Sequence, residues 1–262
     1  MPHPPQATDG RAAAVAYGGL TYEDFRHRAR DETLSETEKI GSPDALRAGY
    51  TAAILKDLVA KLPALLREGA TLVDIGAGCG ALTRALIAGA ATRAQRYLAV
   101  DSAEMLALLP DAAGLARIPG RFPEESLAPL KEALPERGAD VVLAYGVLQT
   151  VYLDGNPFAF LDAAASLLAP GGALLIGDVA NHSQLRRFLA SEAGRAYHRA
   201  YMRTEAPPDL PPFAVDPGRL DDAVLIGLLS RARASGFDAW LLPQPAALPV
   251  SNRREDLLVV RP

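Results

Sequence analysis

A glycine-rich loop between a short apolar run and a helical pattern is the strongest chemical signal in this sequence. It reads Gly-Ala-Gly-Cys-Gly over residues 76–80. Glycines at such a junction let the chain turn tightly and let a ligand approach the backbone with no Cβ in the way. Asp101 follows 21 residues after Gly80, at the end of the next apolar run. A carboxylate there can accept hydrogen bonds from both hydroxyls of a ribose, so the spacing predicts a nucleoside-binding site.

Asp74 separates two interpretations of this loop. The pattern Gly76-x-Gly78-x-x-Ala81 also fits the fingerprint of dinucleotide-binding proteins. Asp74 lies two residues before the first glycine, where a carboxylate would repel a pyrophosphate but would attract a cationic ammonium group. An NAD(P)-dependent oxidoreductase also needs a Tyr/Lys or His-based pair at the carboxyl edge of the sheet. None of the four lysines follows the fourth or fifth predicted strand, so a positively charged nucleoside is favoured.

Polar side chains also follow the fourth and fifth predicted strands, where ligands bind in open α/β sheets. His182 has the pKa range of a general base for a hydroxyl group, although a histidine here can equally be a surface group at a helix start. Gln149 and Tyr152 either face a substrate or form the first turn of a helix. The candidate catalytic residues are His182 and Asp178, and the candidate substrate-binding residues are Gln149, Tyr152, Asn181 and Arg254.

Apolar runs alternate with helical patterns along most of the chain, which predicts a mostly parallel sheet. Pro170-Gly171-Gly172 predicts a turn before the fifth strand. Five prolines within 205–217 predict a loop or an extended lid. The predicted strands are 71–75, 97–101, 115–118, 139–145, 173–178, 237–242 and 256–260, and the predicted helices are 81–91, 102–109, 156–168, 183–204 and 220–235.

Composition divides the chain into three predicted parts. Residues 1–16 are rich in proline and polar residues and predict a flexible tail. Residues 17–67 predict an N-terminal helical cap, since apolar residues recur at helical spacing between 54 and 62. Residues 68–262 predict the ligand-binding α/β domain, with 183–219 as a helical, Pro-rich insertion.

Net charge and cysteine content limit the classes of ligand and macromolecule that the protein is expected to bind. A net charge of −4 gives no general attraction to nucleic acid or to an anionic membrane. The single cysteine, Cys79, excludes an intrachain disulfide and a cysteine-based zinc cage, and no metal is expected. The polar N-terminus lacks the apolar segment of a secretory signal, and no apolar run is long enough to span a bilayer. We therefore expect a cytoplasmic protein with a small-molecule substrate, with a homodimer left open.

Three stretches carry a resemblance to a known family. Residues 71–105 resemble the cofactor-binding half of class I S-adenosylmethionine (SAM)-dependent methyltransferases. ADVVLAYGVLQTV (139–151) and LLAPGGALLIGDV (167–179) resemble that family's fourth strand and the turn into its fifth. The resemblance covers about 50–180 and implies a three-layer Rossmann-like sandwich. Its sheet would have seven mostly parallel strands, with an antiparallel last strand inserted between the fifth and sixth.

The resemblance also implies roles for individual residues. Asp74 and the glycine loop would hold the methionyl part of SAM, and Asp101 would hold the ribose. Phe122 stands near the place where the family often has an acidic residue beside the adenine amine, and it could stack on the ring instead. Tyr145 and Gly146 would flank the sulfonium. The implied cofactor-binding residues are Asp74, Gly76, Ala77, Gly78, Gly80, Asp101, Ser102, Met105, Phe122, Tyr145 and Gly146.

The function implied by the resemblance is methyl transfer from SAM to a small molecule, with S-adenosylhomocysteine (SAH) as product. Such a transfer mainly requires that a nucleophile is placed against the methyl carbon, and orientation alone can contribute roughly 7–11 kcal/mol. The lack of an obvious catalytic triad therefore does not count against it. We expect O-methylation of a hydroxyl on a sugar, glycan or secondary metabolite. The alternatives are an NAD(P)-dependent oxidoreductase and a non-catalytic SAM-binding protein.

Overall fold

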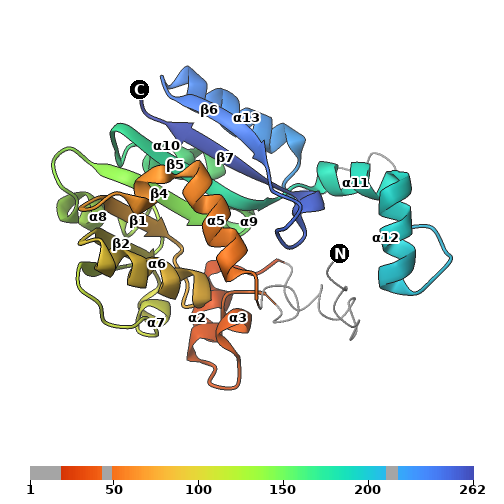
Figure 1. The fold of residues 1–262 in the computed structure, drawn as a ribbon, viewed down its shortest axis with the longest axis horizontal. Helices are drawn as coiled ribbons and strands as arrows, with labels where there is room; N and C mark the ends of the chain where they lie inside the picture. The colour runs from red at the N-terminus through yellow and green to blue at the C-terminus, as the bar shows by residue number, and fades with distance from the viewer. Residues whose placement is uncertain (1–18, 43–48, 211–217) are drawn as a thin grey trace.

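The sheet has the strand order expected from the resemblance. The computed structural model describes residues 19–42, 49–210 and 218–262, so the predicted tail and residues 211–217 of the Pro-rich loop lie outside it. The described strands form one seven-stranded sheet in the order β3-β2-β1-β4-β5-β7-β6 (Figure 1). β7 runs antiparallel to β5 and β6, and the other pairs are parallel. The strands are β1 Thr71–Ile75, β2 Arg96–Asp101, β3 Leu115–Pro119, β4 Ala139–Tyr145, β5 Leu168–Ala180, β6 Asp238–Pro243 and β7 Arg254–Val260.

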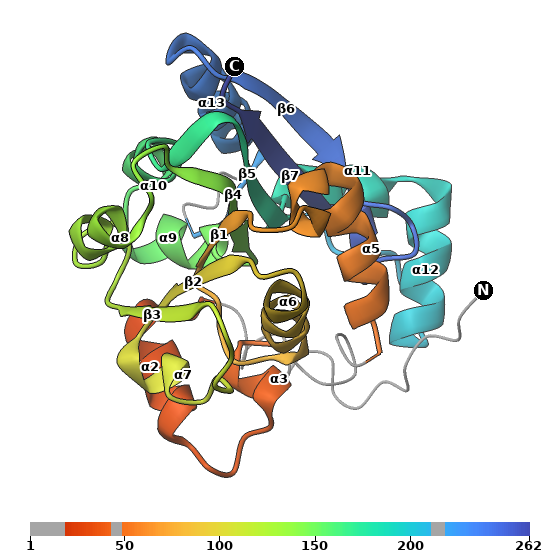
Figure 2. The ribbon, with the colours of Figure 1, turned by 60° about the vertical axis from the view of Figure 1, so that its left-hand side comes forward.

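Helices cover both faces of the sheet and complete three layers. Side chains alternate along β1, because successive residues of a strand point to opposite faces. Leu72 packs with α5 and α6 on one face, whereas Val73 and Ile75 pack with α8, α9, α10 and α13 on the other (Figure 2). The helices are α2 Tyr22–Arg30, α3 Glu36–Lys39, α5 Thr51–Lys61, η1 Pro63–Leu66, α6 Ala81–Thr92, α7 Ala103–Leu106, α8 Leu127–Ala133, α9 Leu148–Asp154, α10 Pro157–Ala165, α11 His182–Ala190, α12 Glu192–Met202, α13 Asp222–Ala234 and η2 Ser251–Arg253.

Local sequence sets several helix ends. The Asn156 side chain accepts the N–H groups of Phe158 and Ala159 at 3.0 and 3.1 Å and so caps α10. Pro157 occupies the first position of that helix, where its missing N–H costs nothing. Gly236 follows α13 with φ of 87°, the left-handed conformation that glycine tolerates after a helix.

Two predicted segments are wrong in detail. The single helix predicted for 183–204 is two helices, α11 and α12. Ser191 between them has an extended backbone, and its hydroxyl accepts the N–H of Gly194 at 3.1 Å, so it caps α12. The corner is tight, since a Cβ on Gly194 would lie 1.8 Å from the carbonyl oxygen of Phe188. The turn predicted at 170–172 is instead part of β5, at an irregularity in its pairing with β4.

The helices outside the three layers form two separate groups, α2 with α3 and α11 with α12. α2 lies between α7 and α3, and α11 and α12 project at the right of the view, with α11 next to η2 (Figure 1). Within the described ranges, no helix combines the length and the apolar character that a membrane span requires.

Candidate functional site

The predicted site residues gather around one cavity of about 940 Å³ at the carboxyl ends of the parallel strands. Every residue named above as a catalytic, cofactor-binding or substrate-binding candidate lines it, with the exception of Ser102. Most of these residues lie at the ends of β1, β2, β4 and β5 or in the segments that follow β1 to β5, and Arg254 is the first residue of β7. The strand order brings them together, because parallel strands end at the same edge of a sheet.

The glycine loop presents bare backbone to this cavity. Gly76 and Gly78 have φ of 68° and 66°, which disfavours any residue with a side chain. A Cβ on Gly76 would also lie 2.5 Å from the Cγ2 atom of Val147. The N–H groups of Gly76 and Ala77 donate to the carbonyl of Val100 at 2.8 and 3.2 Å. The loop is therefore held against β2 while it stays open to a ligand.

Asp101 is oriented by two backbone N–H groups at the end of β2. Its Oδ2 accepts the N–H of Gly78 at 2.9 Å, and its Oδ1 accepts the N–H of Ser102 at 2.7 Å. Ser102 is buried, and its hydroxyl accepts the N–H of Met105 at 3.2 Å, which caps α7. Ser102 thus supports Asp101 from behind, whereas Met105 itself reaches the cavity.

Asp74 has a partner that sequence reasoning missed. Its carboxylate accepts a hydrogen bond from the hydroxyl of Tyr97, which is fully buried in β2. Asp74 and Tyr97 lie on neighbouring strands, where Leu72 pairs with Tyr97 and Asp74 with Ala99. The tyrosine therefore orients the carboxylate at the cavity wall, a relationship that only the strand register defines.

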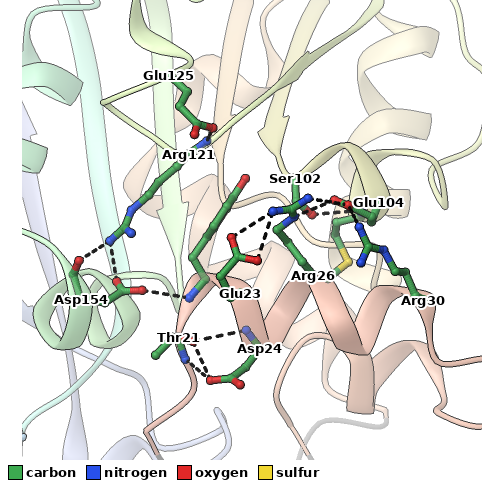
Figure 3. A network of polar contacts seen from close by, with 12 residues as sticks. Thr21, Glu23, Asp24, Arg26, Arg30, Ser102, Glu104, Arg121, Glu125 and Asp154 are labelled. Atoms are coloured by element: carbon green, nitrogen blue, oxygen red, sulfur yellow. Dashed lines mark hydrogen bonds and ion pairs between the residues drawn. The ribbon is translucent and has the colours of Figure 1, made fainter.

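Helix α2 forms part of the cavity wall and contacts helices on two sides of the site. Its Arg26 forms two hydrogen bonds to Glu104 of α7, at 3.1 and 2.8 Å. On the other side, the Tyr22 N–H donates to Asp154 of α9 at 3.1 Å, and Arg121 also binds Asp154 at 2.8 Å (Figure 3). α2 is thus attached both to the β2 side and to the β4 side of the site. The cavity-lining residues that it and the α3 region contribute, which sequence reasoning missed, include Tyr22, Phe25 and Ile40.

At the far end of the cavity, Asp178 has a left-handed backbone with φ of 57°. Its N–H donates to Oδ1 of Asp256 at 2.8 Å. Its carbonyl accepts hydrogen bonds from Nε2 of Gln149 at 3.1 Å and from Nη1 of Arg254 at 2.8 Å. Three of the predicted residues, from β5, α9 and β7, are therefore in direct contact. Such a conformation costs roughly 1–3 kcal/mol for a residue other than glycine, and these bonds hold it in place.

Asn181, His182 and Tyr152 differ in their positions in the helices and in their hydrogen bonds. Asn181 caps α11, because its Oδ1 accepts the N–H of Gln184 at 3.1 Å, while its Nδ2 donates to Asp222 and Glu255 at 2.7 Å each. Its side-chain polar atoms therefore already have protein partners. His182 is the first residue of α11 and lines the cavity. Gln149 and Tyr152 both lie on α9, and both line the cavity.

Comparison with known proteins decides between the cofactor classes. The family described as "Methyltransferase domain" matches residues 47–206, more than half of the chain. The chain is a class I SAM-dependent methyltransferase. Its cofactor is SAM, and the oxidoreductase alternative is set aside. No curated protein matches the chain at a significant level.

Several solved structures share the methyltransferase fold. A SAM-dependent methyltransferase from Aquifex aeolicus is 15% identical, with a TM-score of 0.50, over 87% of this chain and 100% of that one. An O-methyltransferase family protein from Burkholderia thailandensis is 17% identical, with a TM-score of 0.51, over 93% and 63%. The N-methyltransferase NodS from Bradyrhizobium japonicum, in complex with SAH, is 13% identical, with a TM-score of 0.50, over 92% and 98%. At identities this low, the structural similarity shows a shared fold and nothing about the substrate.

The residues of the methyltransferase site fit SAM. Gly76 and Gly78 leave backbone exposed where a side chain would fill the space. The buried carboxylate of Asp74 has the charge that an ammonium group requires, and the carboxylate oxygens of Asp101 at the neighbouring strand end are of the kind that ribose hydroxyls require. Metal-ligand clusters are absent from the residues that the structure describes.

Asp74 and Asp101 lie beside the glycine loop, at what we call the cofactor end of the cavity, and burial disfavours the charged form of both side chains. It raises the pKa of Asp74 to about 7, although the Tyr97 hydrogen bond opposes the shift. It likewise raises the pKa of Asp101 to about 6, against the opposing effect of the Gly78 and Ser102 N–H groups. Desolvation disfavours the charged form of an acid, so a cationic ligand that binds here also restores the charge of Asp74.

We expect the affinity for SAH to rise between about pH 5.5 and pH 7, by up to about tenfold per pH unit. Below the raised pKa of Asp74, a proton must leave the carboxylate before it can pair with the ligand's ammonium group. Calorimetric titration across this range measures the slope. Asp74→Asn is expected to flatten it and to leave the smaller contribution of Asp101.

The stability of the ligand-free protein has the opposite dependence on pH. A carboxylate whose folded pKa exceeds its unfolded pKa binds more protons in the folded state. Its contribution to stability is therefore greatest below the unfolded pKa and falls as the pH rises toward about 7. Equal slopes with and without SAH would contradict the assignment of Asp74 to the ammonium group.

Proposed function

We propose that this methyltransferase transfers the methyl group of SAM to a hydroxyl oxygen of a small molecule such as a sugar, glycan or secondary metabolite. The observation that carries this proposal is an unsatisfied acceptor at the far end of the cavity. Oε1 of Gln149 is buried and has no hydrogen-bond donor among the described residues. A buried acceptor without a partner costs about 1–3 kcal/mol, and a hydroxyl group of the substrate can supply the missing donor.

The orientation of the Gln149 amide supports this argument. Its Nε2 donates to the carbonyl of Asp178, which can only accept a hydrogen bond. Oε1 must therefore point the other way. Since α9 carries Gln149 along the cavity wall, a substrate hydroxyl bound beside Asp178 and His182 would pair with this acceptor in the proposed complex.

His182 and Asp178 are the proposed catalytic pair. When bound, SAM supplies an electrophilic methyl group on a sulfonium. An imidazole can accept the proton of a hydroxyl group, so His182 would act as the general base, and Asp178 would orient the hydroxyl or stabilise the resulting imidazolium. Gln149, Tyr152 and Arg254 would position the acceptor, and Asn181 would contribute by holding the start of α11.

The N-terminal helices support a further part of the proposal, namely that residues 17–67 cap the site. Tyr22 of α2 and Ile40 after α3 line the cavity, and closure over a reacting centre excludes water. The similar structures include both an O-methyltransferase family protein and an N-methyltransferase. The choice of a hydroxyl oxygen is therefore part of the proposal, and the assay below tests it against an amine.

The proposal is tested by following the conversion of SAM to SAH with a panel of sugars, polyols and phenols, each beside its amino analogue. With a ¹³C-labelled methyl group, the chemical shift of the product distinguishes O-methyl from N-methyl. Turnover of the amino analogues alone would overturn the assignment to oxygen. SAH binding without turnover of any acceptor would favour the non-catalytic alternative.

His182→Ala is expected to lower kcat by about 10²–10⁴-fold, the range contributed by general acid–base catalysis. The affinity for SAH should stay unchanged, because the cofactor end of the cavity is formed by other strands. His198→Ala is the matched control, since His198 lies on α12 and does not line the cavity. Equal kcat values for the two variants would remove His182 from the mechanism and leave the methyltransferase assignment intact.

A further inference from the structure

Apart from Arg121, which pairs with Glu124 and Asp154, the charged residues that line the cavity form two groups. The cofactor end carries the carboxylates of Asp74 and Asp101. The far end carries three arginines, Arg219, Arg253 and Arg254, together with His182. The carboxylate of Asp178 also lines this end, next to Arg254. A cationic cofactor accounts for the acidic end, whereas the basic end calls for a different ligand chemistry.

Arg253 and Arg254 are adjacent residues at the junction of η2 and β7, and both retain unused donors. The Nε atoms of both side chains are buried and form no hydrogen bond to any described residue. Arg254 donates from Nη1 to the carbonyl of Asp178, a neutral group. Its Nε is 3.8 Å from Oδ1 of Asp178, which is an ion pair but too long for a hydrogen bond.

Arg253 has the less favourable environment of the two. Burial lowers the pKa of its guanidinium, and the neighbouring charge of Arg254 lowers it further. The phenols of Tyr197 and Tyr201 on α12 act in the opposite direction. Arg253 forms no ion pair with any described carboxylate. Holding a partly buried cation beside a like charge is costly unless a counter-charge is present.

We propose that the far end of the cavity binds an anionic group of the acceptor, a carboxylate or a phosphate, through Arg253 and Arg254. The inference rests on the proposed function, because it treats the anion as part of the molecule that receives the methyl group. Guanidinium groups present paired N–H donors that match the oxygens of a carboxylate or phosphate. An anion bound there would direct the rest of the acceptor past Asp178 and Gln149, toward the glycine loop.

The test is thermal unfolding of the protein saturated with SAH, titrated with sodium phosphate and, separately, with sodium succinate. Sodium chloride keeps the ionic strength constant, so that general screening does not contribute. A saturable rise in Tm is expected for the wild type, and the anion with the lower apparent Kd identifies the kind of group that the site prefers. In Arg253→Gln the apparent Kd should rise by at least about tenfold, the loss of one charge-assisted bond.

Two further variants complete the experiment. Arg254→Lys keeps a positive charge but lacks the planar fork of donors, so it should weaken the response without removing the charge beside Asp178. Arg231→Gln is the control, because Arg231 forms an exposed ion pair with Asp162 away from the cavity. Circular dichroism confirms that each variant is folded before its titration is interpreted.

Three outcomes would overturn the inference. One is the absence of a saturable response in the wild type, and another is an equal response in Arg253→Gln. The third is a response that occurs without SAH and disappears with it, which would assign the arginines to the cofactor's own carboxylate. Failure of the proposed function is a separate result, seen as no SAH binding in the wild type or no methyl transfer to any hydroxyl compound, whatever the anion titration gives.

Discussion

Lys61→Met is expected to lower the free energy of unfolding by about 3–5 kcal/mol, the cost of leaving a buried charge without its partner. Nζ of Lys61 on α5 binds Oδ2 of Asp57 at 2.6 Å and Oδ2 of Asp256 on β7 at 2.7 Å. Asp256 is completely buried. Burial raises the pKa of Asp256, and the Lys61 ammonium opposes that shift. Without the lysine, the carboxylate must either stay charged in the core or take up a proton.

Denaturant unfolding at neutral pH measures this loss, with Lys56→Met as the matched control. Lys56 lies on the same helix and is exposed, so its replacement should change stability little. The deficit of Lys61→Met should shrink as the pH falls. An acid with a raised folded pKa destabilises the folded state mainly above its unfolded pKa. A deficit that is equal for the two lysines would contradict the role of the buried ion pair.

The same variant should also disturb the far end of the cavity. Oδ1 of Asp256 accepts the N–H of Asp178, whose left-handed backbone depends on such bonds. Adding Asp256→Asn to Lys61→Met should recover part of the lost stability, because an amide can be buried without a counter-ion. No recovery in the double variant would show that the charge of Asp256 is not the source of the loss.

Asp101→Asn is expected to weaken the binding of SAH by about ten- to hundredfold, the value of one charge-assisted hydrogen bond. The substitution keeps the size of the side chain and an oxygen that can still accept the N–H of Gly78. It removes the charge and one of the two acceptors at the end of β2. The glycine loop should therefore keep its conformation while the ribose hydroxyls lose a strong partner.

Calorimetric titration with SAM and SAH measures this effect, and Asp111→Asn is the control. Asp111 lies ten residues after Asp101, and its side chain is 97% exposed and pairs with Arg117. Unchanged affinity in Asp101→Asn would mean that the ribose is bound elsewhere. Binding of NAD⁺ in place of SAH would contradict the cofactor assignment itself.

The cofactor end of the site could be predicted because its signals are local. The glycine loop and the two acids lie at the ends of consecutive strands, and the strand–loop–helix pattern is encoded within about 30 residues, as in other nucleotide-binding units. Hydrophobic periodicity located each strand to within a few residues. The corrections fell where periodicity is weakest: at the Ser191 break between α11 and α12, and at the irregular start of β5.

The far end of the site could not be predicted to the same depth. Residues after the fourth and fifth strands were recognised as candidates, but their contacts join segments distant in the sequence. Gln149 and Arg254 meet on the carbonyl of Asp178, which is 29 residues from the first and 76 from the second. Periodicity reports which face of an element is buried, and it carries no information about which side chains meet across elements.

The sequence by itself therefore determined the class of sheet, the glycine loop after β1 and the placement of Asp74 and Asp101 at the ends of two neighbouring strands, since each follows from short-range backbone preferences. Tertiary structure alone decided three things: the Tyr97 hydroxyl on Asp74, the position of α2 in the cavity wall, and the contact between Lys61 and Asp256, which are 195 residues apart. The reason is physical. A hydrogen bond or ion pair depends on the distance between two groups, and for distant residues only the register of strands and the packing of helices sets that distance.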